Sequence, residues 1–253
     1  NGSEEEILRG VVDGIGTHVP IVGGSAGDDL QFKETYVIGN GVYKNSSVIT
    51  VIQSALKIGI GMGHPYYPTD KTCVVTKSKG RTVYELDGKP AAERVKELLG
   101  VDELTSEIFA KNPFGVRTTD VYGQYIIKSM AYENEDGSIT FYAEVPENIT
   151  LTLMESDPDY AIESFKKTLE TAIRDAGNPK RIGAIVVFNC VLRYLLKLRF
   201  NNMDDTEIAK EFLGEEIPII GFNTYGEQGK SLGGGVGNYN QTATVLVIGD
   251  EAL

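Results

Sequence analysis

Residues 157–190 read DPDYAIESFKKTLETAIRDAGNPKRIGAIVVFNC, and this stretch decides the fold class. After Pro158 the apolar residues recur at helical spacing, which predicts an amphipathic helix. Asp157 suits the N-cap of that helix, and Gly177 suits the residue just beyond its end. The β-branched run Ile182–Phe188 then predicts a central parallel strand that is covered on both faces. A long helix followed by a buried strand is typical of an α/β protein.

Weaker patterns on either side of this stretch predict further elements, most of them strands. The expected helices are Glu4–Ile15, Lys89–Leu99, Glu103–Ala110, Val191–Phe200 and Asp204–Leu213. The expected strands are Val19–Gly23, Thr35–Ile38, Ser47–Ser54, Lys57–Met62, Thr72–Thr76, Thr82–Leu86, Gln124–Tyr132, Thr140–Val145, Thr150–Met154, Ile217–Gly221 and Ala243–Ile248. We therefore expect an α/β protein with α+β elements, built as two mixed-sheet lobes with flanking helices.

Two segments of the chain share one pattern. Val19–Gly23 is followed by Gly27-Asp28, and Ile217–Gly221 is followed by Gly226-Glu227. One interpretation is an internal structural duplication, and the other is chance recurrence of helix–Pro–strand–Gly units. Under the duplication, the counterpart of the 182–188 strand would precede residue 1, so the chain would be N-terminally truncated.

Charge and composition exclude several classes of function. The 253 residues carry a net charge of −12, which disfavours nucleic acids and anionic membrane surfaces as partners. No apolar run approaches the roughly 20 residues of a membrane helix. Cys73 and Cys190 are far apart and indicate neither a disulfide framework nor a zinc site. We expect a cytoplasmic protein without a metal or other cofactor.

Polar side chains gather where two candidate neighbouring strands end. Because ligands collect at the carboxyl ends of strands in open α/β sheets, we expect a ligand site there. The expected ligand-binding residues are Ser25, Asn189, Cys190, Arg193, Asn223, Thr224, Tyr225 and Glu227.

The chemistry of three of these residues suggests what they bind. Arg193, beside the backbone N–H groups of a helix start, could hold a carboxylate, and Glu227 could hold an amine. Such a pair suits an amino-acid-like ligand; the alternative is a solvated loop acid and a surface charge. Cys190 at a strand-to-helix turn could be a nucleophile, but a small buried cysteine is the commoner outcome. We expect no catalytic residues.

The order of short motifs along nearly the whole chain resembles the FIST family of proteins. The motifs are Val19–Asp28, Leu86–Ala91, Asn112–Val116, Asp136–Ile139, Val145–Glu147, Leu151–Met154, Phe188–Cys190 with Arg193, and Gly221–Glu227 ahead of Asn240–Thr242. The resemblance implies a FIST N-like part over residues 1–85 and a FIST C-like part over residues 86–253. Two departures stand out: the family usually has a strand and more helix before Glu4, and Asn148 stands where glycine is usual.

The resemblance also implies a function. FIST proteins are prokaryotic sensory input domains that bind a small ligand, with amino acids proposed, and signal to an output domain or partner such as a histidine kinase or chemotaxis receptor. Two alternatives stay open. One is a cysteine-dependent hydrolase that uses Cys190, and the other is a protein-interaction module without a small-molecule site.

Overall fold

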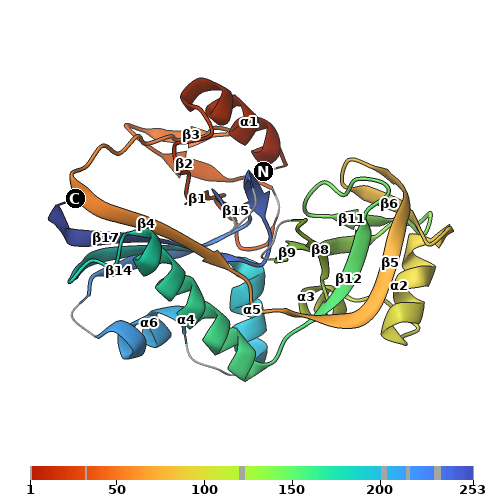
Figure 1. Ribbon diagram of the computed structural model, residues 1–253. Helices are drawn as coiled ribbons and strands as arrows, with labels where there is room; N and C mark the ends of the chain where they lie inside the picture. Colours follow the sequence, from red (N-terminus) through yellow and green to blue (C-terminus); the bar gives the residue numbers. More distant parts are fainter. Residues whose placement is uncertain are drawn as a thin grey trace.

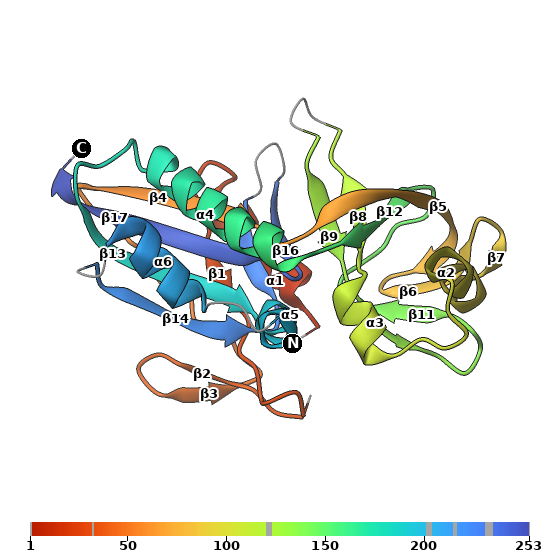
Figure 2. The same ribbon diagram turned by 90° about the horizontal axis from the view of Figure 1, so that it is seen from below.

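The protein consists of two lobes with helix α5 between them. The computed structural model describes residues 2–31, 33–119, 123–200, 204–214, 217–230 and 235–252. Both ends of the chain contribute to the lobe on the left of Figure 1, and the middle of the chain forms the lobe on the right. Helix α5 (Val191–Phe200) stands between them (Figures 1 and 2). The expected α/β class is confirmed.

A four-stranded mixed sheet forms the centre of the first lobe. Its order is β14 (Ile219–Thr224), β13 (Ile182–Cys190), β17 (Ala243–Ala252) and β4 (Leu56–Gly63). Strand β13 is parallel to β14 and antiparallel to β17, so the predicted central strand has a parallel neighbour on one side only. The carboxyl ends of β13 and β14 therefore meet at one edge of the sheet, as the sequence predicts.

Helix α4 (Pro158–Asp175) covers one face of this sheet. The Asp157 carboxylate accepts the Tyr160 N–H at 2.9 Å, and Gly177 has φ +74°, which confirms both predicted ends of the helix. Glycines in β4 let the helix approach closely: a Cβ at Gly61 would lie 2.2 Å from the carbonyl oxygen of Thr168. The buried side chains between helix and sheet include Phe165, Leu169, Ile185, Val187, Val245 and Val247. Helix α6 (Asp205–Leu213) packs beside α4.

The second lobe is an antiparallel sheet with two short helices. Its strands are β5 (Tyr67–Lys79), β6 (Thr82–Leu86), β7 (Lys89–Pro90), β8 (Phe114–Arg117), β9 (Tyr125–Lys128), β10 (Met130–Glu133), β11 (Ile139–Phe141) and β12 (Thr150–Glu155). Its helices are α2 (Ala91–Leu99) and α3 (Ser106–Lys111). Its separate core includes Val83, Leu86, Val95, Phe114, Phe141 and Leu151. The chain passes between this lobe and the first through two short segments, one between β4 and β5 and one between β12 and α4.

Small elements lie on the side of the first sheet opposite α4 (Figure 1). They are α1 (Glu4–Ile15), the hairpin of β2 (Tyr36–Ile38) with β3 (Val42–Lys44), and a sheet of β1 (Gly23–Gly24), β15 (Glu227–Lys230) and β16 (Val236–Tyr239). Strand β1 pairs with β15, so the two segments that share a sequence pattern lie against each other. None of the described helices is long and apolar enough to cross a membrane.

Three predicted strands are wrong in whole or in part. Of Val19–Gly23 only the last residue enters a strand, of Thr140–Val145 only the first two do, and Ser47–Ser54 forms none. The segment 47–54 is exposed along its length, because no described strand offers it a ladder of backbone partners. Its counterpart in the suggested duplication, β17, is the best-paired strand of the sheet, so the two units have different structures here.

Strand pairing also crosses the expected division between residues 1–85 and 86–253. Strand β4 pairs with β17, and β5 pairs with β12, so each lobe takes strands from both parts. The expected division into a FIST N-like part and a FIST C-like part therefore stays a prediction.

Candidate functional site

A cavity of about 360 Å³ opens between the lobes at the first turn of α5. The second lobe contributes Arg81 and Tyr142 to its wall. The first lobe contributes the start of α5, the ends of the neighbouring strands and the N-terminal segment: Cys190, Val191, Leu192, Tyr225, Asn238, Asn240, Gly2, Glu4, Leu30, Lys33, Glu34, Thr35 and Asn45. Its volume falls within the range of small-molecule sites.

Charged residues of both signs surround the cavity. The Arg81 guanidinium donates to Glu4 at 3.2 Å and to Glu5 at 2.8 Å, which ties α1 to the second lobe. Glu34 forms an exposed ion pair with Lys44. The cavity therefore suits a ligand that is polar or carries both charges, rather than an apolar one.

Asn240 is the most unusual residue of the wall. Its side chain is 2% exposed, and its Oδ1 has no hydrogen-bond partner among the described residues. A buried carbonyl oxygen left without a donor costs about 1–3 kcal/mol. Such a cost is ordinarily relieved by a ligand or an ordered water, so this atom marks a position where a donor fits.

Cys190 lies at the floor of the cavity, where β13 passes directly into α5. The backbone N–H groups of Leu192 and Gln241 and the carboxyl group of Glu227 lie around its sulfur. Burial, with the negative charge of Glu227, raises the pKa of the Cys190 thiol well above its ordinary value. Because the thiolate is the nucleophile, this neutral thiol is poorly suited to catalysis.

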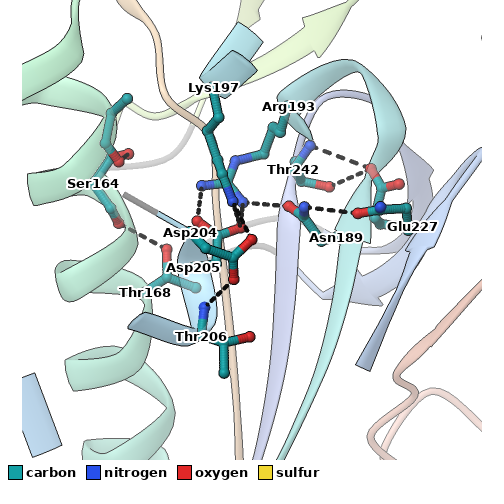
Figure 3. Close-up of polar contacts among 12 residues, drawn as sticks. Ser164, Thr168, Asn189, Arg193, Lys197, Asp204, Asp205, Thr206, Glu227 and Thr242 are labelled. Atoms are coloured by element: carbon teal, nitrogen blue, oxygen red, sulfur yellow. Dashed lines mark hydrogen bonds and ion pairs between the residues drawn. The ribbon is translucent and has the colours of Figure 1, made fainter. Parts of the chain in front are cut away.

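Glu227 lies behind Cys190 and is completely buried. It accepts the Thr224 hydroxyl at 2.6 Å. It also accepts the Thr242 hydroxyl at 2.9 Å (Figure 3). Burial raises the pKa of Glu227 to about 7, although the hydrogen bonds act in the opposite direction. Its carboxylate is thus occupied by protein groups from three strands or strand ends.

Arg193 points away from the cavity, toward α6. Its guanidinium pairs with Asp205 at 3.0 Å and donates to Asn189 (Figure 3). It also lies 5.4 Å from the centre of the Phe165 ring. Lys197, one turn later, pairs with Asp204 at 3.2 Å. These buried contacts fix α5 against α4 and α6, so Arg193 sets the position of the helix whose first turn lines the cavity.

Two of the eight predicted site residues, Cys190 and Tyr225, line the cavity. The Tyr225 hydroxyl donates to Asp28 at 2.7 Å and holds the loop after β1. The other six surround these two: Asn223 accepts from Asn189 at 3.1 Å, and Ser25 accepts from Gln228 at 3.0 Å, while Thr224, Glu227 and Arg193 make the contacts given above. The roles of all eight in ligand binding stay predictions.

The remaining residues of the cavity wall have a weak signal in the sequence or none. Asn240 belongs to a motif noted from the sequence, Asn240–Thr242, but nothing in that motif indicated an orphaned carbonyl. Arg81 and Tyr142 come from the second lobe, and no local pattern predicts that they face α5.

Comparison with known proteins identifies the family. The FIST N domain model matches residues 1–89, and the FIST C domain model matches residues 91–230. The chain belongs to the FIST family. FIST domains are sensory domains of signal-transduction proteins, so the family indicates a sensory rather than a catalytic role.

A curated relative supports the assignment without adding a function. The FIST chain is 33% identical over 253 aligned residues to MJ1623, an uncharacterised protein of Methanocaldococcus jannaschii. The match covers 89% of this chain and 48% of the relative, so the chain spans about half the length of that protein. No solved structure matches the chain.

Proposed function

We propose that this FIST module is the sensory input part of a prokaryotic signalling protein, and that it binds a small polar ligand such as an amino acid at the start of α5. The observation that carries the proposal is the cavity of about 360 Å³, whose wall is drawn from both lobes. A ligand there contacts Arg81 and Tyr142 on one side and the first turn of α5 on the other. It therefore has different contacts in any arrangement that separates the lobes.

The contacts between the lobes are the ones that such a rearrangement would change, and they include the packing of Leu196 of α5 against Ile127 and Met154. Gln241 forms a buried bridge next to the cavity: its Nε2 donates to Ser129 of the second lobe at 2.8 Å, and its Oε1 contacts the Tyr66 hydroxyl. Arg81 forms another polar bridge, to α1, and Arg199 of α5 pairs with Glu107 of α3. A ligand that binds one lobe arrangement more tightly shifts the population toward it, and a signalling output domain or partner such as a histidine kinase or chemotaxis receptor would read that shift.

A thermal-shift screen with amino acids, small organic acids and nucleotides tests this function. A ligand at 100 times its dissociation constant stabilises the protein by roughly 2.7 kcal/mol. The variant Leu192→Trp, which narrows the cavity, should abolish the shift. The matched variant Leu198→Trp changes a side chain that is 59% exposed on the same helix and should leave the shift intact. A hit that survives Leu192→Trp would place the site elsewhere, and a screen without hits would refute the proposal.

An interaction surface is a second candidate function, favoured by a separate observation. Large apolar side chains are exposed on β14, on the β2–β3 hairpin and in the segment 47–54, among them Ile220, Ile38 and Val51. Large apolar side chains left exposed to water in this number are typical of surfaces that contact another protein. Replacement of Val51 and Ile220 by serine should weaken association with a signalling partner and leave small-ligand binding unchanged; unchanged association would exclude this surface.

A further inference from the structure

The N-terminal part of the chain forms one wall of the cavity but has little packing of its own. Among the described residues 2–31 and 33–56, only the Leu8 side chain is buried. The same part supplies a large share of the cavity wall, including Glu4, Leu30, Glu34 and Thr35. Regions with few buried apolar contacts are the ones that open most readily in a folded protein. This wall is therefore the least firmly packed side of the cavity.

The far end of this part is anchored to the first lobe. Strand β1 pairs with β15, and the Tyr225 hydroxyl donates to Asp28 at 2.7 Å. Before this anchor, α1 ends at Gly16, which has φ +84°, a conformation that glycine adopts readily. Residues 17–22 form neither helix nor strand. Helix α1 can therefore turn about residues 16–22 while β1 stays paired.

An ion-pair cluster holds the first turn of α1 to the second lobe. Arg81 Nη2 lies 3.2 Å from Glu4 Oε2 and 2.8 Å from Glu5 Oε2. Burial lowers the pKa of the nearby Lys128, and the negative charges of Glu5 and Glu144 oppose that shift. Because Glu4 and Arg81 both line the cavity, the cluster lies at its edge, where α1 meets the second lobe.

We propose that α1 is a gate over the cavity at the start of α5, and that the pairs of Arg81 with Glu4 and Glu5 hold this gate closed. When the pairs break, α1 turns about Gly16 and exposes the cavity down to its floor at Cys190. The inference rests on the cavity of the proposed function, and it makes one ion-pair cluster control entry to that cavity.

The two cysteines report on the gate without any ligand. Cys190 lies at the floor of the cavity, whereas Cys73 is buried in the core of the second lobe. Labelling of the full chain with iodoacetamide at one fixed pH, measured for each cysteine by peptide mass spectrometry, separates gate opening from unfolding, because unfolding exposes both thiols. Hydrogen exchange of residues 4–15 in the same samples follows α1 itself.

The variant Arg81→Gln should speed both the labelling of Cys190 and the exchange of α1 roughly fivefold, the factor expected for one ion pair near the surface. Labelling of Cys73 should not change. The matched control Glu6→Gln removes an exposed carboxylate from the same turn of α1 and should keep the parent rates.

Salt provides a second test that needs no variant. Raising the ionic strength from about 0.1 M to about 1 M shortens the screening length from roughly 10 Å to roughly 3 Å. The parent should then label faster at Cys190, and Arg81→Gln should respond much less. If the variant unfolds and both thiols react, the salt dependence of Cys190 labelling in the unmodified chain decides the matter.

Unchanged Cys190 labelling in a folded Arg81→Gln variant would overturn the inference. Faster exchange of α1 without faster labelling would also overturn it, because α1 would then move without opening the cavity. Both results leave the proposed ligand site standing, since the thermal-shift screen tests that site separately.

Discussion

Glu227 should make the folded protein lose stability as the pH rises from about 4.5 to about 7. Its pKa is raised in the folded state from 4.5 to about 7, mainly because the side chain is completely buried. The folded state therefore holds a proton that the unfolded state has already released in this range, and stability falls as pH rises. The displacement corresponds to roughly 3 kcal/mol.

The variant Glu227→Gln isolates this effect. Glutamine can still accept from Thr242 and contact the Thr224 hydroxyl, but it does not titrate. Urea unfolding of both proteins between pH 4.5 and 8 measures the difference in free energy of unfolding. The variant should gain roughly 3 kcal/mol relative to the parent across this range.

A matched control corrects for the lost formal charge. Glu211→Gln removes an exposed carboxylate from α6 and should leave the pH profile close to that of the parent. If the difference in free energy of unfolding between the parent and Glu227→Gln stays constant with pH, the raised pKa of the buried Glu227 side chain is wrong.

Two further predictions concern the packing that positions the cavity. Arg193→Leu leaves Asp205 buried without its closest cation and should lower the free energy of unfolding in urea by roughly 3–5 kcal/mol. Adding Asp205→Asn should restore part of that loss, whereas additive losses in the double variant would show that the pair is not coupled. Gly61→Ala places a Cβ 2.2 Å from a helix carbonyl oxygen and should destabilise the folded protein by roughly 1–3 kcal/mol. Gly10→Ala in α1 places a Cβ with nothing within 4 Å and should stabilise the folded protein by up to about 1 kcal/mol. Thermal melts of equal midpoint for the two alanine variants would contradict the close approach of α4 to β4.

The sequence predicted those elements whose cause is local. Helix α4 carries its own N-cap, its apolar face and its terminal glycine, so its limits were readable to within a residue or two. Strand β13 and the meeting of polar residues at its end followed from a β-branched run and the rule for strand ends. The segment 47–54 has similar β propensity but no strand beside it, and propensity cannot supply a hydrogen-bonding partner.

The sequence predicted where the site lies better than it predicted which residues line it. Arg193 and Glu227 were predicted as ligand-binding residues because of their charges. The direction in which the Arg193 side chain points, however, depends on Asp205, which lies twelve residues away on another helix. The pairing of Glu227 with two threonines depends on contacts among three separate strands or strand ends. Asn240 and Arg81 reach the cavity only through the packing of one lobe on the other.

Amide chemical-shift mapping of a ligand titration tests the central claim most directly. The uniformly ¹⁵N-labelled FIST chain would be titrated with the best hit from amino acids and small organic acids. We predict shifts that saturate together at Val191 and Leu192 in α5, at Asn240, and at Arg81 and Tyr142 in the other lobe. Saturating shifts confined to one lobe, or absent from the start of α5, would contradict a ligand site between the lobes.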